Sequence, residues 1–459
     1  MRTLVGVASN FYRFQPHRIP HCRWQVSNVV ASSAKQSFHD DFMTWIRNKT
    51  SLEISSVLAI GSSHYGRSLF ASQCIECGEC ILKIPHSVHL TPDKILPAVL
   101  SLVADDIEPI SRLAVVVLAE QKLGMDSEWF PYINSLPRIS DMHNTVFWTQ
   151  DELKMIKLSP VYEKTIQLKS FLAKEFSALK PALQNFPSIF GDVKLKRFVH
   201  AYSLVVSRAW GTSEGVSLVP FADFLNHDRA SESVLLSDED KGFSEVIADR
   251  NYAIGDEILI RYGNFSNSTL MLNFGFTLQD NIHDQVEITM DVPLQDPLHS
   301  MKMGLLCKHS LQPISNKSLT SSGSSFIIKE IKNSSKKRKG IPLALRAFAR
   351  ILSVSTCEDL KALSINAFQS DGRLARQPLK DIRIEIEAHR ILLSKFETMI
   401  ESRDAAIKDL ELSNERGHDA QPSLRRQMAI NLLKGELRVL KSAAAWITNY
   451  CESLLAYVE

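Results

Sequence analysis

The sequence predicts an α+β fold, in which helices separate two β portions and a helical part follows them. Short apolar runs broken by glycine, typical of strands, occupy residues 57–85 and return at 216–276. Between them, over residues 91–208, the apolar residues recur at helical spacing. Beyond residue 340 the helical spacing is sustained over long amphipathic segments. With 459 residues, of which 44% are hydrophobic, the chain is long enough for two or three domains.

Composition narrows the class of protein. The net charge of +2 is too close to neutral to indicate a nucleic-acid partner, and none is expected. The longest purely apolar run, residues 114–119, is far shorter than the roughly 20 residues of a membrane-spanning helix, so no membrane segment is expected. Seven cysteines without a signal-peptide pattern fit a reducing compartment.

The first 39 residues contain no Asp or Glu, and basic residues are interspersed with Ser, His and Val. This composition predicts an organellar transit peptide, of a chloroplast or a mitochondrion, and the alternative is a disordered basic tail. In the alternative case the protein would reside in the cytoplasm or nucleus. The folded protein is predicted to begin at about Asp40, where Phe42, Trp45 and Ile46 follow helical spacing.

The early β portion contains apolar runs at 69–71 and 81–85, which are predicted to pair as a hairpin around Gly78. Three cysteines with the spacing of metal ligands surround this turn: Cys74, Cys77 and Cys80. A structural zinc site needs a fourth Cys or His, so free thiols are the favoured interpretation. In the later β portion, strands are predicted at 243–248 and 257–261.

The C-terminal part is predicted to be helical at 343–352, around 384–400 and at 425–455. Before it, residues 314–340 are rich in Ser, Asn and Lys and are predicted to form a mobile loop. The basic run at 336–339 is compatible with a nuclear import signal or a patch for an acidic partner. A solvated basic loop is the commoner explanation.

Three short segments carry the chemical signal. Residues 220–227 (PFADFLNH) end in Asn226 and His227, whose side chains can offer hydrogen bonds to a ligand. Residues 255–263 (GDEILIRYG) form a strand followed by Tyr262, which can present its hydroxyl to a cleft while its ring packs. Residues 65–71 (YGRSLFA) could bring backbone groups close to a cofactor. Each segment alone has an ordinary structural explanation, but their joint occurrence in this order favours a site.

In this order the three segments resemble the SET-domain family, within it the class of the Rubisco large-subunit lysine methyltransferase. Residues 342–348, 425–430 and 435–440 are similar to the C-terminal domain of that class. The resemblance implies a knotted, mostly-β SET core with a helical insert and a C-terminal all-helical substrate-binding domain. The boundaries it implies are 40–280 for the SET domain, about 91–208 for its insert and 281–459 for the C-terminal domain, with 1–39 outside the fold.

The resemblance also implies a function and a site. The chain would be a monomeric protein-lysine N-methyltransferase that uses S-adenosylmethionine, and Tyr262 would be its catalytic residue. The residues implied to bind the cofactor are Gly66, Arg67, Ser68, Ser207, Asn226, His227 and Tyr262. Those implied to line the substrate side are Arg208, Phe274 and Phe276. The zinc-binding cysteines found after the SET core of many histone methyltransferases are missing here, so no metal is expected.

Two alternatives accompany this interpretation. The acceptor could be a histidine, as in some relatives of this class. The SET core could also be catalytically silent, so that the chain would bind a partner through its C-terminal helices. Ser68 motivates the second alternative, because it stands where the family commonly has a glycine and adds a side chain near the cofactor.

Overall fold

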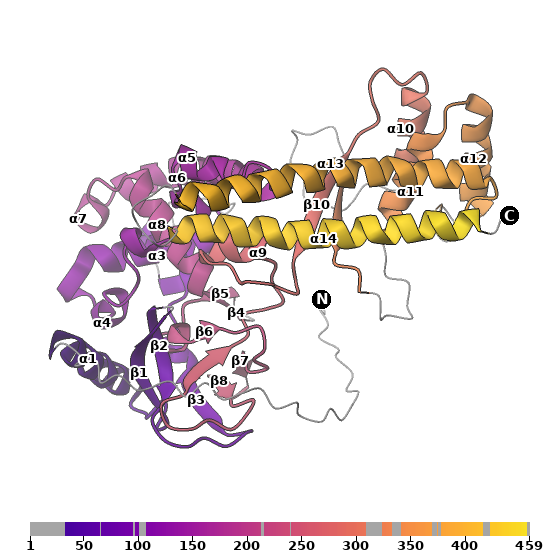
Figure 1. Cartoon of the computed structure of the whole chain (residues 1–459). Helices are drawn as coiled ribbons and strands as arrows, with labels where there is room; N and C mark the ends of the chain where they lie inside the picture. Colours follow the sequence, from indigo (N-terminus) through magenta and orange to yellow (C-terminus); the bar gives the residue numbers. More distant parts are fainter. Residues whose placement is uncertain are drawn as a thin grey trace.

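Two long helices run side by side along most of the molecule and connect its β-rich part to a smaller group of C-terminal helices (Figure 1). They are α13 (Ile382–Glu415) and α14 (Leu424–Leu455). The structure is a computed structural model, and its described ranges are 33–64, 66–94, 97–100, 107–212, 215–238, 240–308, 324–332, 341–369, 374, 378–415 and 423–456. Most of the predicted N-terminal segment, residues 1–32, lies outside these ranges, as does the basic run at 336–339.

A four-stranded sheet with the order β1-β2-β9-β6 organises the β-rich part. Strands β1 (Leu58–Ser63) and β2 (Gly66–Ala71) form an antiparallel hairpin, and β9 (Glu257–Ile260) pairs antiparallel with β2. The short strand β6 (Asn226–His227) pairs parallel with β9. This order places three segments that are far apart in the sequence next to one another.

The hairpin predicted around Gly78 is wrong. Strand β3 (Cys80–Pro85) does not pair with β2 but forms a separate sheet of order β3-β8-β7 with β8 (Phe243–Ile247) and β7 (Leu235–Asp238). The Gly78 N–H donates to the carbonyl of Ala248 rather than closing a two-strand turn. Apolar runs indicate strands, but partners far along the chain decide how they pair. A further short pair consists of β4 (Trp210–Thr212) and β5 (Gly215–Ser217).

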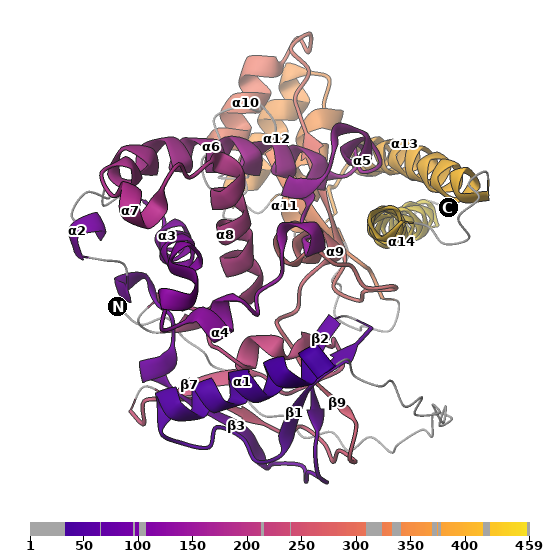
Figure 2. The same ribbon diagram turned by 90° about the vertical axis from the view of Figure 1, so that its left-hand side faces the viewer.

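The helices packed on the β-rich part come from two places in the sequence, before the first strand and between β3 and β4. Helix α1 (Ser33–Thr50) begins before the predicted start at Asp40 and lies along the sheets (Figure 2). The other helices form a layer above α1 and the strands in that view, and α1 contacts α4 in this layer. They are α2 (Pro97–Leu100), α3 (Pro109–Leu123), α4 (Phe130–Ile133), α5 (Gln150–Lys154), α6 (Pro160–Gln184), α7 (Pro187–Phe190) and α8 (Leu195–Arg208).

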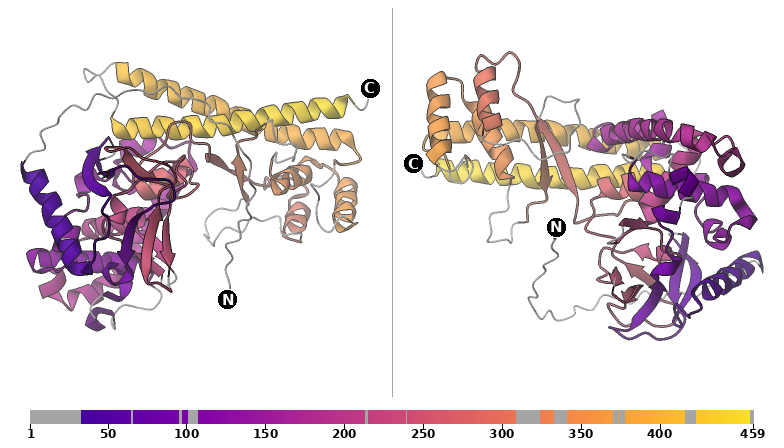
Figure 3. Two further views of the ribbon diagram at one scale, coloured as in Figure 1. Left: turned by 90° about the horizontal axis from the view of Figure 1, so that it is seen from below. Right: turned by 180° about the vertical axis from the view of Figure 1, so that it is seen from behind.

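The C-terminal part is not all-helical as expected, because it contains a small sheet as well as helices. Strands β10 (Gln285–Met290) and β11 (Ser324–Lys329) pair antiparallel and cross the α13–α14 pair (Figure 3). Strand β11 corrects the predicted loop at 314–340, because Phe326 and Ile328 alternate with more exposed residues and are buried against the core of this part. The remaining helices are α10 (His299–Lys308), α11 (Leu343–Ser353) and α12 (Cys357–Gln369).

A single turn of helix, α9 (Asn267–Thr269), continues into a π-helix, η7 (Leu270–Phe274), between the two parts. Met271 of η7 is buried in a hydrophobic cluster that also contains Trp148 and Leu433, so the insert, η7 and α14 share one core. The predicted α+β architecture, with helices inserted in the β core and a helical C-terminal part, is confirmed. In the described ranges no helix has the length and apolar character needed to cross a membrane.

Candidate active site

The pairing of β6 with β9 brings Asn226 and His227 beside Tyr262. Asn226 lies opposite Leu259, and His227 lies opposite the next residue of β9. Tyr262 follows two residues after the end of β9, and its backbone N–H donates to Nδ1 of His227 at 3.2 Å. The two motifs recognised in the sequence are therefore joined by backbone pairing and by a side-chain hydrogen bond.

The hydroxyl of Tyr262 is held in one direction. It donates to the carbonyl of Leu225 at 2.7 Å. Burial raises the pKa of Tyr262 to about 12, with the nearby Asp223 adding to the shift and Arg208 opposing it. The hydroxyl is therefore protonated near neutral pH, and because its hydrogen points to Leu225, its oxygen lone pairs can accept a hydrogen bond from a ligand.

Aromatic rings surround Tyr262. The centroid of its ring is 5.2 Å from that of His227 and 5.4 Å from that of Phe274. The ring of Trp210 meets it edge-on, at 6.0 Å and 90°. Phe276 contacts the other members, at 6.0 Å from His227 and 6.3 Å from Phe274. The structure thus brings the predicted Phe274 and Phe276 to Tyr262, and it adds Trp210, which the sequence did not single out.

The third sequence segment joins this site through Asn226. The side-chain amide of Asn226 donates to the carbonyl of Arg67 at 3.1 Å. Arg67 itself donates to the carbonyl of Ser135 at 2.6 Å, and its guanidinium lies 4.8 Å from the ring centroid of Phe224. Gly66 has a φ of +99°, and a Cβ at this position would meet no atom within 4 Å. The backbone here has a glycine conformation and open space beside it.

Two predicted site residues do not present their hydroxyls to the aromatic cluster. Ser68 is fully buried in β2, so the side chain that replaces the glycine of the family points into the protein interior. Ser207 donates its hydroxyl back to the carbonyl of Ser203 at 2.8 Å, within α8. Oγ of Ser68 is buried without a hydrogen-bond partner among the described residues, whereas the hydroxyl of Ser207 is used within its own helix.

A buried carboxylate beside Tyr262 was missed in the sequence. The hydroxyl of Tyr132 donates to Oδ2 of Asp223 at 3.1 Å. Arg208, predicted on the substrate side, donates from Nη1 to the Asp223 carbonyl at 2.9 Å and lies 3.6 Å from Oδ2. Burial raises the pKa of Asp223, while Arg208 and Tyr132 oppose that shift. Asp223 could have been found inside the motif at 220–227, but Tyr132 lies in the helical insert and has no local signal.

Several polar atoms around Tyr262 are buried without a hydrogen-bond partner among the described residues. They are Oδ1 of Asp223, Nε of Arg208 and Nε1 of Trp210. Leaving such atoms unsatisfied costs about 1–3 kcal/mol each, so a partner for them is expected from outside the described protein atoms. Phe221, in the same motif, has a φ of +74°, a conformation that is strained for a bulky residue. Strain and unsatisfied polar atoms together mark this place as a binding site.

Cys74, Cys77 and Cys80 are exposed free thiols. Over the described ranges, no group of three or more His, Cys, Asp or Glu residues is arranged to hold a metal ion.

Comparison with protein families and relatives assigns the two parts of the chain. The SET-domain family matches residues 66–263, and the family described as Rubisco LSMT substrate-binding matches residues 293–440. The chain is 26% identical over 278 residues to the chloroplastic [fructose-bisphosphate aldolase]-lysine N-methyltransferase of Arabidopsis thaliana, a match that covers 58% of this chain and 57% of that protein. It spans only just over half the length of that relative.

Two further relatives match more of the chain. The chloroplastic ribulose-1,5 bisphosphate carboxylase/oxygenase large subunit N-methyltransferase of Nicotiana tabacum is 23% identical over 420 residues, covering 87% of this chain and 79% of that protein. The actin-histidine N-methyltransferase of Plecturocebus moloch is 22% identical over 441 residues, covering 91% and 69%.

Solved structures share the fold. The structure of Rubisco LSMT bound to AdoMet superimposes with a TM-score of 0.69 at 18% identity, covering 91% of this chain and 93% of that one. The SET domain of LSMT bound to lysine and AdoHcy gives a TM-score of 0.71, also at 18% identity, covering 91% and 92%. The two family matches follow one another along the chain, so the protein combines a SET domain over residues 66–263 with a Rubisco LSMT substrate-binding domain over residues 293–440.

Proposed function

We propose that this protein is a protein-lysine N-methyltransferase that transfers a methyl group from S-adenosylmethionine to a lysine side chain of a protein substrate. The observation that carries the proposal is Tyr262, whose protonated hydroxyl is oriented by Leu225 inside a wall of aromatic rings. Asn226 and His227 hold this residue and the segment at Arg67 together. The lysine methyltransferases among the relatives support the same chemistry.

The residues present fit the cofactor. Gly66 offers backbone with open space beside it, and the unsatisfied atoms of Asp223, Arg208 and Trp210 offer one acceptor and two donors near Tyr262. We infer that Gly66, Arg67 and Ser68 through their backbone, together with Asn226 and His227, hold S-adenosylmethionine. When bound, this group supplies an electrophilic methyl on a sulfonium. Ser207 and Arg208, at the end of α8, would lie between cofactor and substrate.

The chain's own part in the reaction is to receive a neutral amine and align it. Lysine has a reference pKa of about 10.4, so deprotonation near pH 7.4 costs roughly 4 kcal/mol. Transfer from water to the aromatic surroundings of Tyr262, Phe274 and Phe276 disfavours the ammonium and lowers this cost. Tyr262 is itself protonated, so it would not act as a base, and its lone pairs would orient the amine.

The proposed setting is an organelle, with the chloroplast as the more specific proposal. The N-terminal segment without acidic residues and the chloroplastic lysine methyltransferases among the relatives support it. A protein substrate is supported by the substrate-binding domain over residues 293–440. We propose that the enzyme acts as a monomer.

The proposal is tested by incubating purified protein with methyl-labelled S-adenosylmethionine and a chloroplast extract. The wild type is expected to label protein lysines, and Tyr262→Phe, which keeps the ring and removes the hydroxyl, should lower the rate about 100-fold or more. Tyr162→Phe, a tyrosine of α6 outside the site, serves as the matched control. Labelling that is undiminished in Tyr262→Phe would remove that residue from its proposed role.

A histidine acceptor is the second candidate, favoured by the match to actin-histidine N-methyltransferase over 91% of the chain. Sequencing the labelled peptide separates the two, since the label must lie on lysine for the first proposal. Calorimetry with S-adenosylmethionine tests the alternative that the SET core is catalytically silent and the chain is a binding protein. A folded wild-type protein that gives no heat of binding would favour that third interpretation.

A further inference from the structure

Strand β10 has one edge that is not used by the described protein. It belongs to a two-stranded sheet and pairs only with β11. In an antiparallel pair, the backbone groups of alternate residues point away from the partner strand. Within the described ranges, no backbone or side-chain hydrogen bond is made to the backbone of residues 286–290 apart from this pairing. The outer edge therefore carries main-chain donors and acceptors available to another strand.

A groove lies along this edge, between β10 and α13. Its volume is about 600 Å³, and residues 287–290 of β10 all line it. Successive side chains of a strand point to opposite faces, so a groove lined by four consecutive residues meets the strand at its edge rather than at one face. The groove therefore lies at the position that a strand added to β10 would occupy.

The opposite wall of the groove is formed by α13, where a stripe of hydroxyl residues lies beside Ile391, Lys395, Met399 and Arg403. Ser394, Thr398 and Ser402 follow one another at intervals of four residues and so share one face of the helix. Thr398 donates to the carbonyl of Ser394 at 3.0 Å, and Ser402 donates to that of Thr398 at 2.7 Å. The hydroxyl donors of Thr398 and Ser402 are thus satisfied within the helix, so these two side chains need no donor partner from a chain in the groove.

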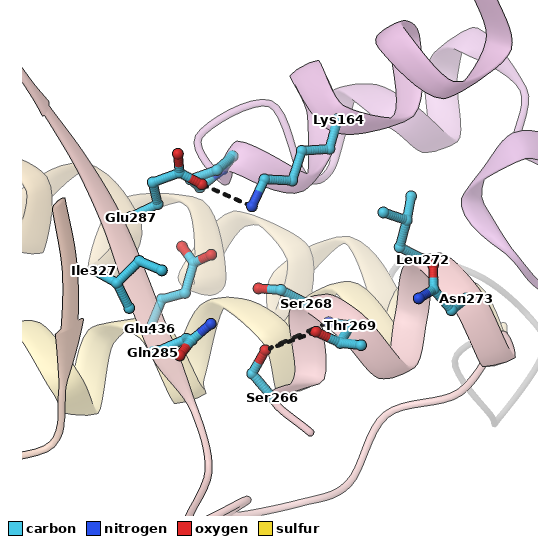
Figure 4. A pocket seen from close by; sticks show the side chains of 11 residues that line it. Lys164, Ser266, Ser268, Thr269, Leu272, Asn273, Gln285, Glu287, Ile327 and Glu436 are labelled. Carbon is cyan, nitrogen blue, oxygen red and sulfur yellow. Dashed lines mark hydrogen bonds and ion pairs between the residues drawn. The ribbon is translucent and has the colours of Figure 1, made fainter. Parts of the chain in front are cut away.

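A second pocket lies next to the groove on the side of the active site. Glu287 lines both the groove and this pocket, which has a volume of about 110 Å³ and reaches Asn273 of η7. Figure 4 shows this pocket, with Glu287 joined across it to Lys164 of α6 by an ion pair of 2.7 Å. The residue after Asn273 is Phe274, whose ring lies 5.4 Å from that of Tyr262. A chain bound along β10 would thus lie next to the element that forms one wall of the catalytic cluster.

We propose that an extended segment of the protein substrate docks in this groove and adds a strand to the outer edge of β10. The inference rests on the proposed function, and it names the part of the enzyme that holds the substrate protein. Main-chain hydrogen bonds along an edge provide affinity for a polypeptide of almost any sequence, which makes a protein segment the occupant that fits this chemistry. The other wall of the groove is α13, which lies entirely within the substrate-binding match at 293–440.

The test fills the groove without touching the active site. Thr398 is exposed, and its hydroxyl bonds only within its own helix, so Thr398→Trp should fold. Thr448→Trp is the matched control, because Thr448 is an exposed threonine of α14 with the same bond to the carbonyl four residues earlier. The probe is the chloroplast extract with labelled S-adenosylmethionine, followed by kinetics on the most strongly labelled protein.

Thr398→Trp should raise KM for that protein about tenfold or more, which corresponds to a loss of about 1.4 kcal/mol in binding free energy, and leave kcat within about twofold. Thr448→Trp should match the wild type.

A second measurement addresses the strand itself. A peptide of the labelled protein that contains the methylated lysine and its flanking residues should slow amide hydrogen exchange of residues 286–290. Equal KM values for the two variants, or unchanged exchange, would overturn the docking site while leaving methylation established. A wild type that labels no protein would instead overturn the proposed function. A wild-type dimer that Thr398→Trp converts to a monomer in sedimentation would assign the groove to a second copy and also overturn the proposal.

Discussion

At the scale of single residues, the site depends on buried polar groups that hold one another in place. Asp223 accepts from Tyr132, lies beside Arg208 and keeps Oδ1 without a partner among the described residues. Asp223 and Arg208 act in opposite directions on Tyr262, since Arg208 lowers the pKa of its hydroxyl and Asp223 raises it. A change at Asp223 should therefore affect the reaction more than the fold.

Asp223→Asn keeps the size of the side chain and an acceptor for Tyr132 but removes the charge. We expect kcat/KM to fall about 10- to 100-fold, the range for losing a hydrogen bond to a charged group. Steady-state kinetics on the labelled protein measures this, with circular dichroism confirming the fold. Asp192→Asn, at an exposed position of the insert, is the control. A normal kcat/KM in Asp223→Asn would show that the charge has no part in the reaction.

His227 gives the site a dependence on pH. Its Nδ1 accepts the backbone N–H of Tyr262, so the bond requires an unprotonated Nδ1. Burial lowers the pKa of His227 below the usual 6.5. A lowered histidine pKa gives stability that is present above pH 6.5 and is lost as the pH falls through the folded value. Activity should accordingly have an acid limb below about pH 6.5. His227→Asn, with an oxygen acceptor that does not titrate, should flatten this limb, and an unchanged limb would assign it elsewhere.

At the scale of elements, α14 packs closely against the end of the SET domain because Gly435 has no side chain. A Cβ at Gly435 would lie 1.9 Å from Oδ2 of Asp284. That carboxylate cannot easily move, since it accepts from the Asn267 backbone N–H at 2.8 Å and from its side-chain amide at 3.2 Å. The absence of a side chain at Gly435 thus allows α14 to contact the segment that contains Asp284.

Gly435→Ala should therefore destabilise the protein although alanine favours helix. The clash costs about 1–3 kcal/mol, against a gain of up to about 1 kcal/mol in helix propensity. A thermal melt should show Tm lowered by several degrees. Gly304→Ala in α10 is the matched control, because a Cβ there meets no atom within 4 Å. It should raise Tm slightly, and a similar rise in Gly435→Ala would show that Asp284 moves aside freely.

The same elements show how far the sequence could predict the structure. Local pattern was sufficient for the strand before Tyr262, whose alternation and preceding Gly255 are local signals, and for the long helices α13 and α14. It was not sufficient for the partner of β3 or for β11, because those depend on contacts with distant residues. The site follows the same division. Asn226, His227 and Tyr262 come from motifs, whereas Tyr132 of the insert and Trp210 of β4 reach the site only through tertiary packing.

At the scale of the whole molecule, one buried ion pair joins the insert to the two long helices. Arg403 of α13 donates from Nε to Glu436 of α14 at 2.9 Å and from Nη2 to the carbonyl of Leu158 at 2.9 Å. The other carboxylate oxygen of Glu436 accepts from Ser159 at 2.6 Å. The side chains of both charged residues are almost fully buried, at 3% and 2% exposure. Their pairing couples the SET domain to the substrate-binding domain, so the two parts should unfold together.

Arg403→Leu would leave Glu436 buried without its counter-charge. Burial already raises the pKa of Glu436 and Arg403 is the main group that opposes the shift, so the variant should raise this pKa further. A carboxyl whose folded pKa is raised contributes stability at low pH that is lost as the pH rises. The destabilisation should therefore be largest at pH 8, about 3–5 kcal/mol, and smaller at pH 5, where Glu436 binds a proton.

Urea unfolding at the two pH values measures this difference, with two transitions expected for the variant at pH 8 where the wild type shows one. Arg383→Leu, at an arginine that is 92% exposed and paired only with Asp381, is the control and should unfold like the wild type. Adding Glu436→Gln to Arg403→Leu should remove the pH dependence, because the buried charge is then gone. An equal loss of stability at pH 5 and pH 8 in Arg403→Leu would mean that packing, not the buried charge of Glu436, holds the two domains together.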